Sequence, residues 1–152
     1  MEDFFIESIG DETATGKDFW DISLNFTPTA VGGCQKKVKK DDDVLFAYCT
    51  RDVTKQYLKL SGPNSATIDA QTKVASVDLT VTNGTGAPIE EATVKVLGQS
   101  IKGSTDKDGK VTIKLTRTGI NKLKATKTNY VRSNQRVILV RRATNNLVST
   151  KL

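Results

Sequence analysis

The chain contains no histidine, so the residues able to do chemistry are its carboxylates, cysteines and lysines. Without histidine, the commonest general base and the commonest zinc ligand are missing. A Ser–His or Cys–His nucleophile is therefore excluded. From residue 63 onward, the carboxylates that occur in close pairs are Glu90 with Glu91 and Asp106 with Asp108. Each pair lies beside a Pro or Gly in a predicted turn, which backbone geometry alone explains. The sequence therefore predicts no catalytic residue and no enzymatic activity.

Metal ions and cofactors are not indicated either. The run Asp41-Asp42-Asp43 lacks the alternating oxygen ligands and the following Glu of an EF-hand loop. A solvated turn facing the neighbouring lysines is favoured over a calcium site. The chain has no Walker A loop and no G-x-G-x-x-G loop. We expect no cofactor, no metal ion and, because no apolar run approaches about 20 residues, no membrane span.

The two cysteines, Cys34 and Cys49, are too few for a four-thiolate metal site. A disulfide between them is favoured, and closing a loop of this size would stabilise the fold by about 3 kcal/mol. The alternative is a pair of buried, reduced thiols in a cytosolic domain.

Positive charge is concentrated in the second part of the chain. Residues 1–62 carry eight Lys or Arg and eleven Asp or Glu, whereas residues 63–152 carry fifteen and six. The change of sign coincides with the turn residues Gly62 and Pro63. The sequence therefore predicts a first module over residues 1–62, a second over 63–142 and a tail over 143–152.

The lysines of the second module suggest a binding surface. If the strands near residues 110–115 and 119–126 pair, one outer face carries four basic residues: Lys114, Lys122, Lys124 and Arg132. Such a face can contact an acidic polysaccharide, an anionic cell surface or nucleic acid. Only Tyr130 lies near it, and single-strand binders need a row of aromatic residues, so nucleic acid is not predicted. The alternative is a solvated lysine-rich face that keeps strand edges soluble.

The hydrophobic pattern of the second module predicts an antiparallel β-sandwich. Apolar residues alternate along several short runs, as at Val77, Leu79 and Val81. Turn pairs such as Asp108-Gly109 separate these runs. In the first module the alternating residues are Trp20, Ile22, Leu24 and Phe26. They predict a strand with Trp20 as an anchor of the core.

The second module resembles a known family over roughly residues 74–140. The family has a G-x-P-[ILV]-x-x-A-x-V turn followed by T-[DN]-x-[DN]-G. The matching residues are Gly86, Pro88, Ile89, Ala92, Val94, Thr105, Asp106, Asp108 and Gly109. This pattern is similar to that of the carboxypeptidase-regulatory-like, transthyretin-related Ig-like module. The resemblance implies an Ig-like fold in a secreted or surface protein, and it implies no chemistry.

The first module resembles the β-grasp module related to the transcobalamin C-terminal domain. The matching segments are D-F-W-D-I-S-L-N, V-G-G-C, D-D-V-L-F-A-Y-C and Y-L-K-L-S-G-P. The resemblance implies a disulfide between Cys34 and Cys49, and a last strand at residues 55–60. Family members begin well before the position of residue 1, so the resemblance also implies an exposed strand edge that a neighbouring chain can fill.

We therefore expect a mainly β protein with a β-grasp-like module followed by an Ig-like or transthyretin-like sandwich. The predicted function is non-catalytic: a structural, adhesive or spacer module of a secreted or cell-surface protein. Binding of carbohydrate or a polyanion, through the basic face or an exposed Tyr48, Tyr57 or Tyr130, and self-assembly through a strand edge are the alternatives. The N-x-[ST] sequons at Asn25 and Asn83 could carry glycans in a eukaryotic host.

Overall fold

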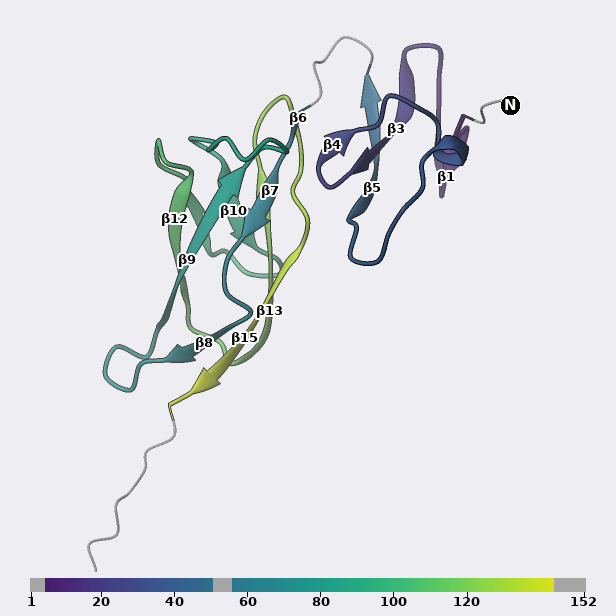
Figure 1. The fold of residues 1–152 in the computed structure, drawn as a ribbon. Coiled ribbons are helices and arrows are strands. Elements are labelled where there is room, and N and C mark those ends of the chain that lie inside the picture. The colour runs from purple at the N-terminus through teal and green to yellow at the C-terminus, as the bar shows by residue number, and fades with distance from the viewer. Residues whose placement is uncertain (1–4, 51–55, 144–152) are drawn as a thin grey trace, which may run out of the picture.

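The fold is that of a computed structural model, which describes residues 5–50 and 56–143. These residues form β-strands joined by turns and loops (Figure 1), and no α-helix occurs among them. The mainly β prediction is confirmed. The strands fall into an N-terminal unit, residues 5–50, and a C-terminal unit, residues 56–143. Residues 144–152 of the predicted tail lie outside the described residues.

The N-terminal unit is a three-stranded antiparallel sheet with a short hairpin beside it. Its elements are β1 (Ser8–Ile9), β2 (Glu12–Thr13), β3 (Asp18–Leu24), β4 (Thr27–Pro28), the 3-10 helix η1 (Gly33–Gln35) and β5 (Val44–Thr50). The sheet has the order β4-β3-β5, and β1 pairs with β2. Strand β5 is therefore an edge strand of this N-terminal sheet.

The C-terminal unit is built from two larger sheets and one short strand pair. Its strands are β6 (Gln56–Tyr57), β7 (Lys59–Ser61), β8 (Ser65–Ile68), β9 (Ala75–Thr82), β10 (Thr93–Val96), β11 (Lys102–Ser104), β12 (Lys110–Leu115), β13 (Gly119–Thr126), β14 (Tyr130–Val131) and β15 (Arg136–Arg142). The five-stranded sheet has the order β11-β10-β13-β15-β8 and the three-stranded sheet the order β12-β9-β7. Most pairs are antiparallel, but β8 joins β15 in parallel, and so does β6 with β14.

One apolar core lies between the two sheets of the C-terminal unit. Alternate side chains of each strand point inward, so that β9 contributes Val77, Leu79 and Val81, each at most 1% exposed. The facing sheet contributes Leu123 and Ile138, which are fully buried. The period-2 pattern of the sequence therefore sets which face of each strand is buried.

A tight turn at residues 106–109 connects the five-stranded sheet to the three-stranded sheet. Asp106 Oδ1 accepts the main-chain N–H groups of Asp108 and Lys110 at 2.9 and 2.8 Å. Gly109 follows with a φ of 71°, and its position lies against the Val81 carbonyl, where a Cβ would collide. This turn delivers β12 to the edge of β9.

The segment before residue 62 belongs to the C-terminal unit by its contacts. The sequence predicts residues 55–60 as the last strand of the first module; residue 55 lies outside the described residues. Instead of joining the N-terminal sheet, β7 pairs with β9. The side chains of Leu58 and Leu60, both at most 1% exposed, complete the core of the C-terminal unit.

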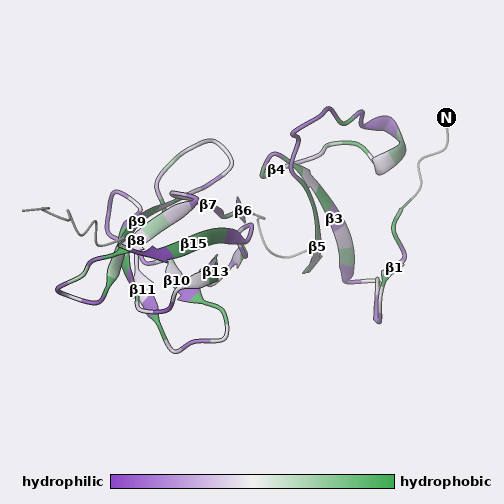
Figure 2. Cartoon of the chain, turned by 90° about the horizontal axis from the view of Figure 1, so that it is seen from below, coloured by the Kyte–Doolittle hydropathy of each residue, from purple (hydrophilic) through white to green (hydrophobic). Residues whose placement is uncertain are grey.

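The N-terminal sheet has little core of its own. The buried residues of its apolar cluster are Phe26, Ala47 and, from the C-terminal unit, Tyr57. The Tyr57 hydroxyl donates to the Asp21 carboxylate at 2.5 Å, and the Lys59 ammonium lies 5.7 Å from the centre of the Phe26 ring. Figure 2 shows the two units side by side from below, with β3 and β5 separate from the strands of the C-terminal unit. The contact between the units is therefore small.

The two faces of the N-terminal sheet differ from the expectation. The register pairs Trp20 with Tyr48 and Ile22 with Phe46, so these side chains share one face. That apolar face, predicted as the core side, is partly open: Phe46 is 45% and Tyr48 37% exposed. The opposite face, where Ser23 is fully buried, faces the C-terminal unit.

Candidate functional site

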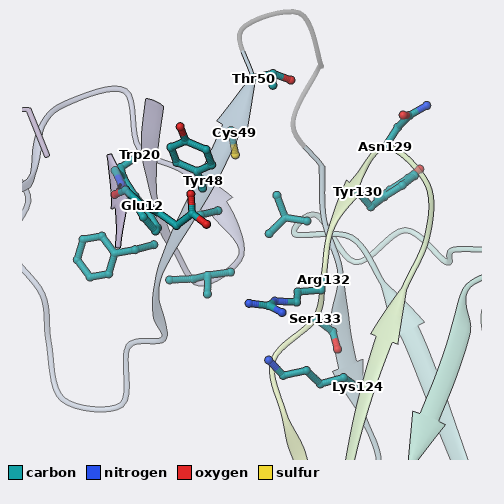
Figure 3. Close-up of a pocket in the computed structure, with 14 residues that line it drawn as sticks. Glu12, Trp20, Tyr48, Cys49, Thr50, Lys124, Asn129, Tyr130, Arg132 and Ser133 are labelled. Carbon is teal, nitrogen blue, oxygen red and sulfur yellow. Dashed lines mark hydrogen bonds between the residues drawn. The ribbon is translucent and has the colours of Figure 1, made fainter. Parts of the chain in front are cut away.

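A cleft of about 670 Å³ lies between the N-terminal sheet and the C-terminal unit. One wall follows the edge strand β5 over residues 45–50, and the other follows residues 129–133. Figure 3 shows Trp20 and Tyr48 on the first side, and Tyr130, Arg132 and Lys124 on the second. We call this feature the edge cleft, and its size is that of an ordinary ligand site.

The first wall of the edge cleft is aromatic, and hydrogen bonds hold its rings. The Trp20 and Tyr48 ring centres lie 5.3 Å apart, with ring planes inclined at 55°. The Trp20 indole N–H donates to the Glu12 carbonyl at 3.1 Å, and the Tyr48 hydroxyl to the Thr13 carbonyl at 2.8 Å. The hairpin β1–β2 therefore orients both rings. The pKa of Tyr48 is raised, first by desolvation and then by nearby Asp18 and Glu12.

The second wall is basic. Asn129 has a φ of 64°, and the Tyr130 N–H donates to the Lys127 carbonyl at 3.2 Å, so the chain turns before β14. Ser133, 2% exposed, holds the end of this segment by accepting the Ala125 N–H at 2.8 Å. This tether fixes residues 130–133 against β13. Arg132 and Lys124 then direct their charged groups toward the N-terminal sheet (Figure 3).

The predicted basic face is divided by the sheet topology, and its pairing assumption is wrong. Strand β12 pairs with β9, whereas β13 pairs with β10 and β15. Lys114 therefore lies on the three-stranded sheet, and Lys122 and Lys124 lie on the five-stranded sheet. The alternation of β12 and β13 is the same in sequence, and only long-range pairing decides which sheet each joins.

The five-stranded sheet carries a row of lysines that sequence reasoning missed. Lys102 is the register partner of Lys95, and Lys95 is that of Lys124. Directly opposite residues point to the same face, and like charges in such positions destabilise a sheet. None of the five strands, all of them described, contains an Asp or Glu. We call Lys102, Lys95 and Lys124 the lysine row, and it ends at the edge cleft.

The structure contains no disulfide between Cys34 and Cys49, so the predicted bridge is not supported. Cys34 is exposed in η1, and a Cβ at the preceding Gly33 would lie 3.3 Å from Ile22 Cδ1. Cys49 is the register partner of Phe19, which lies on the opposite face of β3 from Ile22. Cys49 packs with the cluster around Tyr57. The two cysteines therefore lie toward opposite faces of the N-terminal sheet.

Both sequon asparagines stabilise turns. The Asn25 side-chain amide donates to Asp42 at 2.9 Å and accepts the Asp43 N–H at 3.0 Å. This contact lowers the pKa of Asp42, with the Lys39 N–H as the next cause. Asn83 Oδ1 accepts the N–H groups of Thr85 and Ala87 at 3.1 and 2.9 Å.

Asp69 also stabilises a turn. Asp69 accepts the N–H groups of Gln71 and Thr72, and these bonds lower its pKa, with those from Thr72 the largest cause. Within residues 5–50 and 56–143, no group of three or more His, Cys, Asp or Glu side chains is placed to hold a metal ion.

Tyr57, one of the predicted carbohydrate-binding aromatics, is 1% exposed and lies between the units. Its pKa is raised above the usual value of 10.0, first by desolvation and then by its hydrogen bond to Asp21. Tyr48 and Tyr130, in contrast, both line the edge cleft.

No family model, no curated protein and no solved structure matches the chain. No helix in the described part is long and apolar enough to cross a membrane.

Proposed function

We propose that this chain is a non-catalytic module of a secreted or cell-surface protein, in which the C-terminal unit is a spacer that resists stretching. The N-terminal unit lies at one end of the C-terminal unit, and β15 ends at the other (Figure 1). A pull on the two ends of the chain therefore acts along the C-terminal unit.

The placement of β15 is the observation that carries this proposal. The strand lies inside the five-stranded sheet and pairs with β13 on one side and β8 on the other. A pull along β15 must shear both ladders at once, because their hydrogen bonds lie across the strand. Ile138 and Val140 also anchor the strand in the core.

Stretching the chain by its ends tests the spacer role. The Leu139 N–H donates to the Asn64 carbonyl at 2.9 Å, so the register directs the Ala66 N–H toward β15 and the Thr67 N–H away. Ala66→Pro should lower the unfolding force of the C-terminal unit, and Thr67→Pro should leave it near the wild-type value. Equal forces for all three proteins would contradict the proposal.

The second candidate function is binding of an acidic polysaccharide, and the lysine row favours it. Three adjacent lysines without an acidic neighbour on their strands repel one another in the free protein. A polymer with one carboxylate per sugar would relieve this repulsion. Tyr48 and Tyr130 in the adjacent cleft could then contact sugar rings.

Binding to polygalacturonate at low and high salt, with neutral dextran as the reference, tests the second candidate. The double substitution Lys95→Glu and Lys102→Glu should abolish the salt-sensitive part of binding. Lys114→Glu removes the same kind of charge from the other sheet and should not. If it weakens binding equally, net charge rather than the row is responsible.

The proposal includes the two folds that the family resemblances imply, an Ig-like C-terminal unit and a β-grasp-like N-terminal unit. The two packed sheets and the turn at Asp106 support an Ig-like C-terminal unit. The small N-terminal sheet with its open edge supports an incomplete β-grasp. A crystal structure of the chain would test both.

A further inference from the structure

We propose that the edge cleft accepts an extended peptide as an added strand on β5, and that this peptide alternates apolar and acidic residues. The inference goes beyond the spacer role and rests on the edge of β5 and on the basic residues Arg132 and Lys124 of the opposite wall. It needs no contribution from the lysine-row residues Lys95 and Lys102.

Among the described residues, no strand pairs with β5 on the side of the cleft. The Asn25 N–H donates to the Asp43 carbonyl at 2.8 Å, and hydrogen-bonded pairs alternate along an antiparallel ladder. The main-chain groups of Leu45 and Ala47 therefore point toward β3, and those of Phe46 and Tyr48 point away from it. The Ile22 carbonyl, opposite Phe46, confirms this phase because it accepts the Thr29 N–H from the β4 side.

Open edges of this kind recruit strands. An unpaired edge with several outward N–H and C=O groups is a template for another chain. Addition of a strand to a sheet edge is a common mode of peptide recognition, in which the main chain supplies affinity and side-chain contacts supply specificity. Strand β5 spans Val44–Thr50, which offers a guest of about five to seven residues a length of roughly 20 Å.

The two faces of the sheet determine the guest's side chains. On the outer face, Val44 and Phe46 are 43% and 45% exposed and would gain cover from apolar neighbours. On the inner face, the guest would pass beside Arg132 and Lys124, which reach from the opposite wall (Figure 3). Successive residues of a strand point to opposite faces, so an apolar–acidic alternation satisfies both.

The probe is the capped heptapeptide Thr-Val-Asp-Val-Asp-Val-Thr, titrated by calorimetry against the full chain. The charge control replaces both Asp by Lys and should not bind. Two further peptides carry N-methyl groups, one on the valines and one on the aspartates. In an added strand of either polarity only one of these amide sets points at β5, so one peptide should lose binding and the other should keep it.

Substitutions on the protein supply the matching test. Phe46→Pro removes the outward N–H without breaking the ladder to β3, while Phe46→Ala removes the same ring and keeps the N–H. The proline variant should bind the probe at least tenfold more weakly than the alanine variant. Arg132→Glu should weaken binding about as much, and Lys114→Glu should have no effect. Trp20 fluorescence verifies that each variant keeps the N-terminal sheet.

Three results would overturn the proposal. The first is equal binding by Phe46→Pro and Phe46→Ala, or by the two N-methylated peptides. The second is a dimer of the free chain that Phe46→Pro dissolves, which would make a second copy the occupant. The third is saturable binding of polygalacturonate that Arg132→Glu abolishes while the same substitution leaves binding of the probe unchanged, which would assign the cleft to a polysaccharide.

Discussion

The N-terminal and C-terminal units are both β-structures, but they bury their side chains very differently. In the C-terminal unit, seventeen buried apolar residues form one core between two sheets. The N-terminal sheet shares a cluster of three buried residues, one of which, Tyr57, comes from the other unit. Stability grows with the apolar area buried, so we expect the C-terminal unit to fold alone and the N-terminal sheet to depend on its neighbour.

Because of this difference, the two units are suited to different functions. A unit with a continuous core and a doubly paired last strand is suited to carry tension. A sheet with an open edge and a partly exposed apolar face is suited to take up a partner. Substitutions in each unit test this difference, and the largest loss of stability is expected in the C-terminal core.

A cavity in the C-terminal core should destabilise the whole chain. Leu123 is fully buried, and Leu123→Ala should lower the free energy of unfolding by about 2–5 kcal/mol. Trp20 is the only tryptophan, so its fluorescence reports on the N-terminal sheet alone. We expect denaturant melts followed by Trp20 fluorescence and by circular dichroism to shift together.

The reverse substitution supplies the control. Ile22→Ala in the N-terminal sheet should shift the Trp20 signal and leave the amide resonances of β13 folded. Loss of the C-terminal unit in Ile22→Ala would show that the two units are mutually dependent.

Removing the buried hydroxyl of Thr105 should cause the next largest loss of stability. Thr105, 4% exposed, accepts the Ala92 N–H at 2.9 Å and donates to the Ile89 carbonyl at 2.6 Å. Thr105→Val leaves both groups without this partner and should cost about 1–3 kcal/mol in a chemical melt. Thr105→Ser keeps the hydroxyl and should recover most of the loss; a serine variant as unstable as valine would point to packing instead.

Removing the contact between the units should affect only the N-terminal sheet. Tyr57→Phe deletes the hydrogen bond to Asp21 and should lower the stability of the Trp20 transition by about 1.5 kcal/mol. The force needed to unfold the C-terminal unit should not change. An equal loss in both transitions would contradict this difference between the units.

The same variant should change the response to alkaline pH. The folded state raises the pKa of Tyr57, so it holds the phenol proton more tightly than the unfolded chain does. The stabilisation is fully present below the unfolded pKa, about 10, and is lost as pH rises above it. The stability difference between wild type and Tyr57→Phe should therefore narrow above pH 10; a constant difference would indicate that the phenol is not the group involved.

The smallest predicted effect is a gain in stability rather than a loss. Lys95→Glu places an acidic residue between Lys102 and Lys124 and should stabilise the C-terminal unit by about 0.2–1 kcal/mol at low salt. The gain should shrink as salt screens the charges. Melts at two salt concentrations check this, and a loss of stability at low salt would remove the argument for repulsion in the lysine row.

Local patterns predicted the C-terminal unit well. The alternation of Val77, Leu79 and Val81 set the buried face of β9, and Asp106 with Gly109 marked the turn. These features depend on neighbours in sequence. Lys114 lies on a different sheet from Lys122 and Lys124 because β12 and β13 pair with different distant strands. The two strands show the same alternation, so their sequences do not reveal which partner each will take.

The N-terminal sheet was harder to predict for a different reason. Its alternation at Trp20, Ile22 and Leu24 is correct, but alternation does not say which face meets the rest of the chain. Here the face with Asp21 and Ser23 is the inner one. Tyr57 of the other unit packs against it and donates a hydrogen bond to Asp21. Lys95 was missed as part of a basic face, although the segment T-V-K-V already pointed it outward.

Residue-resolved hydrogen exchange tests the central claim, a self-sufficient C-terminal unit beside an N-terminal sheet with an open edge, most directly. We predict slow exchange for amides in β9, β13 and β15, at rates set by global unfolding. In β5 we predict an alternation, with Leu45 and Ala47 protected by β3 and Phe46 and Tyr48 exchanging at least tenfold faster. Uniform protection along β5, or equal protection of both units, would contradict the account.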